Sequence, residues 1–114
     1  MARNYDRGAA FERKVRDHLE GLGYAAVRSA GSHSPTDVVA CRADQSGVTI
    51  LFVQCKTNGR LDPEEWNDFI DFCETGGAVP LLAKKGKGGR GIIYSRLTGR
   101  KDGGGRQPLA PWEP

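Results

Sequence analysis

The spacing of apolar residues near the start of the chain predicts a helix over residues 6–22. Its apolar positions recur every three or four residues, which places them on one helical face. Asp6 is a suitable N-cap, and Gly21 and Gly23 mark the end of the helix. The apolar stripe consists of Phe11, Val15, Leu19 and Leu22.

A second helix is expected over residues 61–75. Asp62 is a favourable N-cap, Pro63 fits the first helical position, and Glu65 completes a capping box. Two glycines after residue 75 end the pattern. The side chains expected to be buried are Trp66, Phe69, Ile70 and Cys73.

Five shorter runs have the composition of strands: residues 24–29, 37–42, 48–56, 79–84 and 92–97. The third run is nearly all apolar, which is typical of a central strand. The second and third runs flank a turn-forming segment and should form an antiparallel hairpin. The element order α-β-β-β-α-β-β predicts an α/β fold, with a mixed central sheet of about five strands flanked by helices.

Length and composition narrow the class of protein. A chain of 114 residues is expected to form one domain, here residues 1–98 with a short basic arm at the N-terminus. Residues 99–114 are rich in Gly, Pro and charge, which predicts a flexible basic tail. No apolar run is long enough to span a membrane and no secretory signal is evident, so a cytoplasmic protein without a membrane partner is expected. Three cysteines without a CxxC pair favour small buried hydrophobes over a disulfide framework or a zinc site.

The net charge of +3 is unevenly distributed along the sequence. Residues 1–57 carry eight Lys or Arg and six Asp or Glu, residues 58–83 carry one and six, and residues 84–114 carry eight and two. Basic ends of this kind suit a polyanion such as nucleic acid, although an ordinary solvated surface would have the same composition. The basic residues of one Gly-rich loop are candidate phosphate contacts: Lys84, Lys85, Lys87 and Arg90.

The most informative polar residues lie at the ends of the predicted hairpin strands. Asp37 begins one strand, and Gln54 and Lys56 end the next on a shared face. Carboxylate and amide oxygens suit a hard cation such as Mg²⁺, and a lysine beside them can stabilise negative charge on a phosphodiester. The alternative is that Asp37 caps a turn while Gln54 and Lys56 mark the solvated end of a strand.

These residues resemble the D…(D/E)xK pattern of the PD-(D/E)xK nuclease superfamily. More narrowly, the chain resembles the archaeal-type Holliday junction resolvases and their phage relatives. The run Val27–Ser32 followed by Asp37–Ala40 is the most specific part of the likeness. The matching stretches are residues 7–13, 23–32, 37–40, 53–56 and 77–83.

The resemblance implies a restriction-endonuclease-like fold and a Mg²⁺-dependent endonuclease that makes paired cuts in four-way DNA junctions as a homodimer. Mn²⁺ is expected to substitute, and no small-molecule cofactor is expected. By resemblance, Glu12, Asp37 and Gln54 would hold the metal, and Lys56 would be the catalytic lysine. Arg13 and Arg28 match arginines near the scissile phosphate, and Ser32 matches the serine of the active-site loop.

Two departures from the family pattern concern the site. Gln54 stands where the family usually has Glu, which removes one negative charge from the metal site. The loop before Asp37 is one residue longer than in the family, so the functional serine is either Ser32 or Ser34, and His33 lies between them. Two alternatives to a resolvase remain: a related nuclease on duplex, flap or fork DNA, and a junction-binding module weakened in catalysis by Gln54.

Further basic residues and one helix suggest how DNA and a second subunit would be bound. The cations expected to frame the site, besides the Gly-rich loop, are Arg3, Arg7, Arg13 and Arg28. The second helix carries three large aromatic side chains, and we expect a C2 dimer interface there unless the helix simply fills the core. These side chains are Trp66, Phe69 and Phe72.

Overall fold

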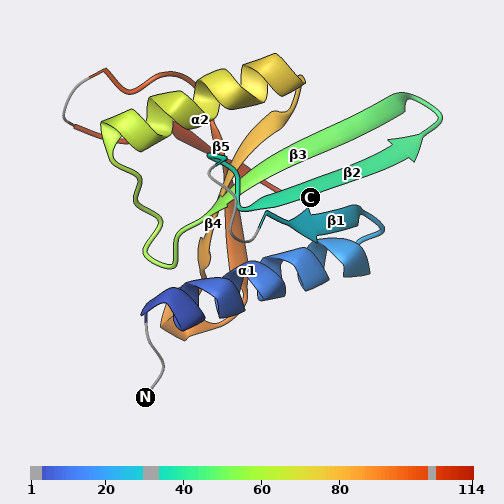
Figure 1. Ribbon diagram of the computed structural model, residues 1–114, viewed down its shortest axis with the longest axis horizontal. Helices are drawn as coiled ribbons and strands as arrows, with labels where there is room; N and C mark the ends of the chain where they lie inside the picture. The colour runs from blue at the N-terminus through green and yellow to red at the C-terminus, as the bar shows by residue number, and fades with distance from the viewer. Residues whose placement is uncertain (1–3, 30–33, 103–104) are drawn as a thin grey trace.

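A computed structural model of the chain describes residues 4–29, 34–102 and 105–114, with residues 4–7 described only in their backbone. Two helices lie on opposite sides of a mixed sheet (Figure 1). The predicted order is confirmed, with one further strand at the C-terminal end. The elements are α1 (Asn4–Gly21), β1 (Ala25–Arg28), β2 (Val38–Asp44), β3 (Gly47–Cys55), α2 (Pro63–Gly76), β4 (Val79–Lys85), the 3-10 turn η1 (Lys87–Gly89), β5 (Ile92–Leu97) and β6 (Leu109–Trp112).

The six strands follow one another in the sheet in sequence order. β3 and β4 pair in parallel because α2 connects them, whereas all the other neighbours are antiparallel. The β2–β3 hairpin closes with Asp44 opposite Gly47, as the turn composition predicted. β3 lies between β2 and β4, which explains its nearly continuous apolar sequence.

Alternating strand residues build a core on each face of the sheet. On one face, Phe11, Val15 and Leu19 of α1 pack against residues such as Val38 and Val53 of the hairpin. α1 begins at Asn4, so Asp6 lies inside this helix instead of capping it. Leu22, at the end of the expected stripe, and Cys41 are exposed, so both expectations of burial were wrong.

On the other face, α2 covers the sheet with the side chains predicted for its buried stripe. Asp62 caps the helix by accepting a hydrogen bond from the backbone N–H of Glu65 at 2.8 Å. Trp66 and Phe69 are fully buried against this chain's own sheet. The expectation that they form a dimer interface is therefore wrong, whereas Phe72 is only half-buried and packs against Phe52 with the two rings tilted.

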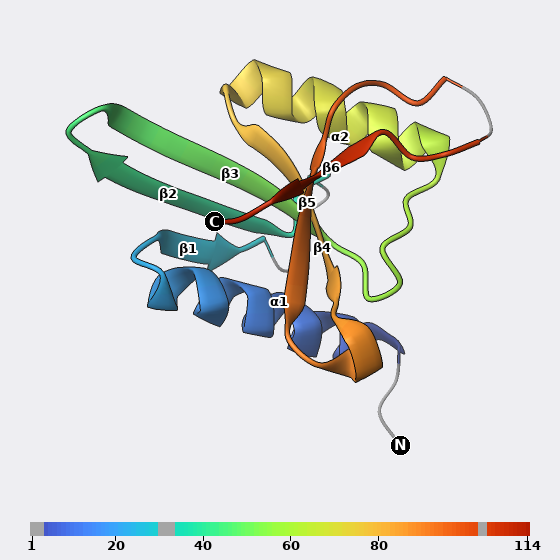
Figure 2. The same ribbon diagram turned by 180° about the vertical axis from the view of Figure 1, so that it is seen from behind.

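The C-terminal segment is part of the fold. β6 pairs with β5 at the edge of the sheet, which Figure 2 shows from behind. The indole N–H of Trp66 donates to the carbonyl of Gly99 at 2.8 Å, and Asn67 exchanges hydrogen bonds with the backbone of Lys101. A flexible tail was thus a wrong expectation for the described residues 99–102 and 105–114. Among the described helices, none is long and apolar enough to cross a membrane.

Candidate active site

Asp37 lies just before β2, where the hairpin strands end. Its backbone N–H donates to the carbonyl of Val53 at 2.9 Å, and its carboxylate accepts a hydrogen bond from the backbone N–H of Cys55 at 2.8 Å. Both bonds cross to β3, so the position of the carboxylate depends on the hairpin register. Among the described residues, no hydrogen bond is made to the second carboxylate oxygen.

The ionisation of Asp37 reflects its burial. Desolvation raises the pKa of this carboxyl from 3.8 to about 6, and the nearby Glu12 and Glu65 carboxylates act in the same direction. The Cys55 N–H and the Lys56 ammonium oppose the rise in pKa. Burial prevails because it removes water from the charged form. A raised pKa in a carboxylate beside other charged groups is typical of functional sites.

Gln54 and Lys56 flank this carboxylate at the end of β3. Gln54 is buried, and its side-chain N–H group donates to the carbonyl of Pro35. The backbone N–H of Lys56 donates to the carbonyl of Ala83 on β4 at 3.0 Å. The Gln54 side chain and the Lys56 backbone are therefore anchored by neighbouring segments, which argues against the reading in which they only mark a solvated strand end.

Glu65 is a site residue that the sequence assigned only to a helix cap. Its carboxylate lies 3.0 Å from the ammonium of Lys56. The first turn of α2 thus delivers a negative charge to the lysine. A capping-box residue gave no sign of this second contact, because the contact depends on how α2 packs beside the end of β3.

α1 and β1 supply a second pair of charges. The Nη2 atom of Arg28 lies 3.2 Å from a carboxylate oxygen of Glu12. Arg28 sits opposite Val38 in the β1–β2 ladder, one residue from Asp37. Its Nε atom is buried and has no hydrogen-bond partner among the described residues, so this guanidinium has an unused donor.

Thr36 supports the loop that leads into Asp37. Its buried hydroxyl accepts a hydrogen bond from the backbone N–H of Val53 at 3.1 Å and lies 2.9 Å from the carbonyl of Val38. Ser29 and Ser34 both donate to the carbonyl of Thr36, Ser34 at 3.2 Å. The choice between Ser34 and Ser32 stays a prediction, since residues 30–33, including His33, lie outside the described part of the chain.

The predicted DNA-binding cations are spread over several elements. Arg13 is exposed on α1, and the backbone of Arg7 lies in the same helix, whereas Arg3 is outside the described residues. Figure 2 shows the β4–β5 connection beside the N-terminal half of α1. That connection and the end of β4 carry four exposed cations, none in an ion pair among the described residues: Lys84, Lys85, Lys87 and Arg90.

Comparison with known proteins agrees with this geometry. The family model of the archaeal Holliday junction resolvase (Hjc) matches residues 3–102. Over 92 residues the chain is 35% identical to the crossover junction endodeoxyribonuclease Hjc of Methanocaldococcus jannaschii, an alignment that covers 77% of this chain and 65% of that relative.

A solved structure shares the fold. The Holliday junction resolvase Hjc of the archaeal hyperthermophile Archaeoglobus fulgidus aligns with a TM-score of 0.62 and 27% identity, over 77% of this chain and 70% of that one. The expected restriction-endonuclease-like α/β fold is thereby confirmed. Because the family model matches residues 3–102 of its 114 residues, the chain belongs to the archaeal Holliday junction resolvase family.

Proposed function

We propose that this chain is a Mg²⁺-dependent endodeoxyribonuclease that resolves four-way DNA junctions. The observation that carries the proposal is the half-buried Asp37 carboxylate at the open end of the hairpin, held by the Cys55 N–H at 2.8 Å and close enough to Glu12 and Lys56 for both charges to influence its raised pKa. A half-buried carboxylate beside a lysine is the arrangement needed to bind a cation and a phosphodiester together. The family membership supports DNA junctions as the substrate.

The oxygen donors of the site fit Mg²⁺. Among the described residues, no three His, Cys, Asp or Glu side chains gather into a metal site. Mg²⁺ does not require such a cage, because it keeps several waters and takes one or two carboxylates together with substrate phosphates. Asp37 would be the main ligand, with the amide oxygen of Gln54 and a carboxylate oxygen of Glu12 beside it, and Mn²⁺ should substitute.

The chemistry that such a cation supplies when bound is polarisation of the scissile phosphate and activation of a water molecule. Lys56 would place its ammonium against the negative charge that develops on the phosphate. Glu65 holds that ammonium 3.0 Å away before DNA arrives. Arg28, whose guanidinium lies 3.2 Å from Glu12, would add its positive charge to the same end of the site.

Gln54 lowers the negative charge of the site by one relative to the usual Glu. Its amide already donates to Pro35, which turns the side chain so that its oxygen is the remaining ligand atom. A neutral oxygen can bind Mg²⁺, although more weakly than a carboxylate. We therefore expect cutting to need a higher Mg²⁺ concentration, without loss of the reaction.

Paired cuts on two strands require two such sites, so we propose a homodimer. The buried Trp66 and Phe69 take no part in it. The half-buried Phe72, which packs against Phe52, is the aromatic side chain on α2 left to contact a second copy. Light scattering at micromolar concentration should give the dimer mass, and a monomer with and without junction DNA would contradict this proposal.

The test is cleavage of a labelled, immobile four-way junction with Mg²⁺, beside a linear duplex of the same sequence. We expect paired symmetric cuts in the junction alone, and none with Asp37→Asn. Cutting of duplex, flap or fork DNA as fast as the junction would indicate a related nuclease instead. Tight junction binding without cutting in Mg²⁺ or Mn²⁺ would indicate a junction-binding module.

A further inference from the structure

A large open cleft lies beside the candidate site, on the face of the sheet that α2 covers. Its volume is about 670 Å³. One wall is the connection between β3 and α2, residues 58–62, and the opposite wall comes from the C-terminal segment before β6. Leu82 of β4 and Ser95 of β5 lie between the two walls.

The cleft has an excess of uncompensated positive charge. Four cations from three separate parts of the sequence line it: Arg60, Lys84, Lys101 and Arg106. None of them forms an ion pair among the described residues. The acidic residue in the lining is Asp62, and its carboxylate is already engaged in capping α2.

The two walls are tied together by hydrogen bonds. The side chain of Gln107 donates to the carbonyl of Gly59 at 3.0 Å and accepts from the backbone N–H of Leu61 at 3.1 Å. These bonds fix the two walls relative to each other before a ligand arrives, which lowers the entropy lost on binding.

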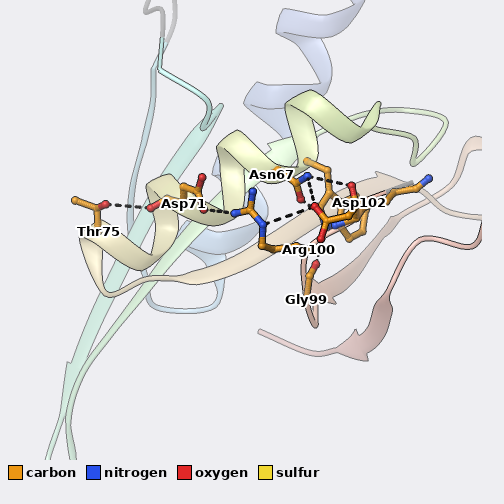
Figure 3. Close-up of polar contacts among 8 residues, drawn as sticks. Asn67, Asp71, Thr75, Gly99, Arg100 and Asp102 are labelled. Atoms are coloured by element: carbon orange, nitrogen blue, oxygen red, sulfur yellow. Dashed lines mark hydrogen bonds and ion pairs between the residues drawn. The ribbon is translucent and has the colours of Figure 1, made fainter. Parts of the chain in front are cut away.

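α2 anchors the C-terminal wall. Figure 3 shows Asn67 and Asp71 of α2 facing Arg100 and Asp102. The side chain of Asn67 accepts from the backbone N–H of Lys101 at 2.8 Å, and the guanidinium of Arg100 lies 2.5 Å from the carboxylate of Asp71. The paired Arg100 points its charge at α2, whereas the neighbouring Lys101 lines the cleft.

The cleft adjoins the candidate active site through the backbone. Residues 58–62 are separated from Lys56 by Thr57 alone, and Lys84 follows Ala83, whose carbonyl accepts a hydrogen bond from Lys56. Gly59 has a φ of +71° and lies against Lys84, where an added Cβ would come within 2.8 Å of the lysine Cδ. The first wall is therefore packed closely onto β4 beside the catalytic lysine.

We propose that this cleft binds the sugar-phosphate backbone of a junction arm next to the cut strand. The inference rests on the proposed function and extends it to a surface that includes the C-terminal segment. Four separated cations in an open cleft suit a chain of phosphates, since contacts to phosphates fix position without reading sequence. Each phosphate contact also releases a condensed counterion, so its loss has a measurable salt signature.

The test measures junction affinity in the Asp37→Asn background, which prevents cutting. The double variant Arg60→Ala/Arg106→Ala removes two cleft charges, and Arg16→Ala/Arg42→Ala removes two charges that lie outside the cleft, one paired with Asp17 and the other over the ring of Tyr24. Loss of two phosphate contacts should weaken binding roughly 60-fold at 0.1 M salt and reduce the slope of log K against log[salt] by about 2. The control should bind within about twofold of the parent.

Two further readouts separate the possible failures. The loss should be equal for two junctions of unrelated sequence, and Arg60→Lys/Arg106→Lys should restore most of the affinity. If the parent binds the junction but the cleft and control variants are weakened equally, or neither is weakened, the cleft proposal is wrong. If the parent fails to bind and the wild-type chain fails to cut, the proposed function is wrong and the cleft proposal falls with it. Thermal unfolding of each variant checks that it is folded.

Discussion

Replacing Asp37 with Asn should stabilise the metal-free chain at pH 8 while it stops DNA cutting. Burial raises the pKa of Asp37 from 3.8 to about 6, so the folded chain binds this proton more tightly than the unfolded chain does. The corresponding stability is fully present below about pH 4 and is lost as the pH rises through about 6. The neutral amide of Asn has no such dependence.

The magnitude follows from the size of the shift. A rise from 3.8 to about 6, at about 1.4 kcal/mol per pH unit, amounts to about 3 kcal/mol. The difference in free energy of unfolding between Asp37→Asn and the wild type should therefore grow by up to about 3 kcal/mol between pH 4 and pH 8. For a chain of this size, the difference corresponds to a change of roughly 10 °C in Tm.

Urea unfolding of both proteins in EDTA, at several pH values between 4 and 8, measures this difference. Asp44→Asn is the control, because hydrogen bonds from Ser46 lower the pKa of that exposed carboxyl. The stability that Asp44 contributes is lost only as the pH falls to and below the unfolded value of 3.8, so the difference between Asp44→Asn and the wild type should stay nearly constant from pH 4 to pH 8. Mg²⁺ should reduce the difference in free energy of unfolding between Asp37→Asn and the wild type at pH 8, because it stabilises the wild type alone.

A constant difference between Asp37→Asn and the wild type across this pH range would refute the reasoning, because it would mean that ionisation of Asp37 has no cost in the folded chain. If the free energy of unfolding of the wild type rose relative to that of the variant with increasing pH, the reasoning would be refuted more directly. Undiminished cutting by the variant would show that the site has been assigned to the wrong carboxylate.

Three further changes test neighbouring contacts. Gln54→Glu adds a carboxylate beside Asp37, so the Mg²⁺ concentration for half-maximal cutting should fall about tenfold in a metal titration. Glu65→Gln removes the partner that holds the Lys56 ammonium at 3.0 Å, so kcat should fall about tenfold with junction affinity unchanged in single-turnover and binding assays. Thr36→Val leaves the buried N–H of Val53 without its 3.1 Å partner, so urea unfolding should show a loss of about 1–3 kcal/mol.

Each of these changes has a matched control or a contrary outcome. Glu64→Gln, on the exposed side of the same helical turn, should leave kcat unchanged, and an equal fall in both variants would remove Glu65 from the site. Thr75→Val removes an exposed hydroxyl that donates to the backbone carbonyl of Asp71 at 3.0 Å. This change should lower the free energy of unfolding by less than about 0.5 kcal/mol. An unchanged Mg²⁺ requirement in Gln54→Glu would exclude this side chain as a ligand.

The sequence by itself determined the helices and the hairpin, and it identified the central residues of the candidate site. Helix and strand periodicities are local properties, and so is the cap formed by Asp62. Asp37 and Lys56 were identifiable because the hairpin register follows from a short turn, which brings its strand ends together without reference to the rest of the chain. The likeness to the resolvase family rested on the same local stretches.

Only the tertiary structure decided which side chains the helices and strands contact. Trp66 and Phe69 were expected at a dimer interface, but the sheet buries them in this chain, since an apolar helical stripe does not specify what covers it. Glu65 reaches Lys56 only because α2 packs beside the end of β3.

The C-terminal segment shows the same division between local and long-range information. Its Gly, Pro and charged residues carry no periodicity, so the sequence indicated a flexible tail. In the folded chain, side chains of α2 form hydrogen bonds with the backbone of this segment. Strand β5 pairs with β6 at its end. Polar groups in an aperiodic segment are satisfied by distant partners, and only the folded chain places those partners within reach.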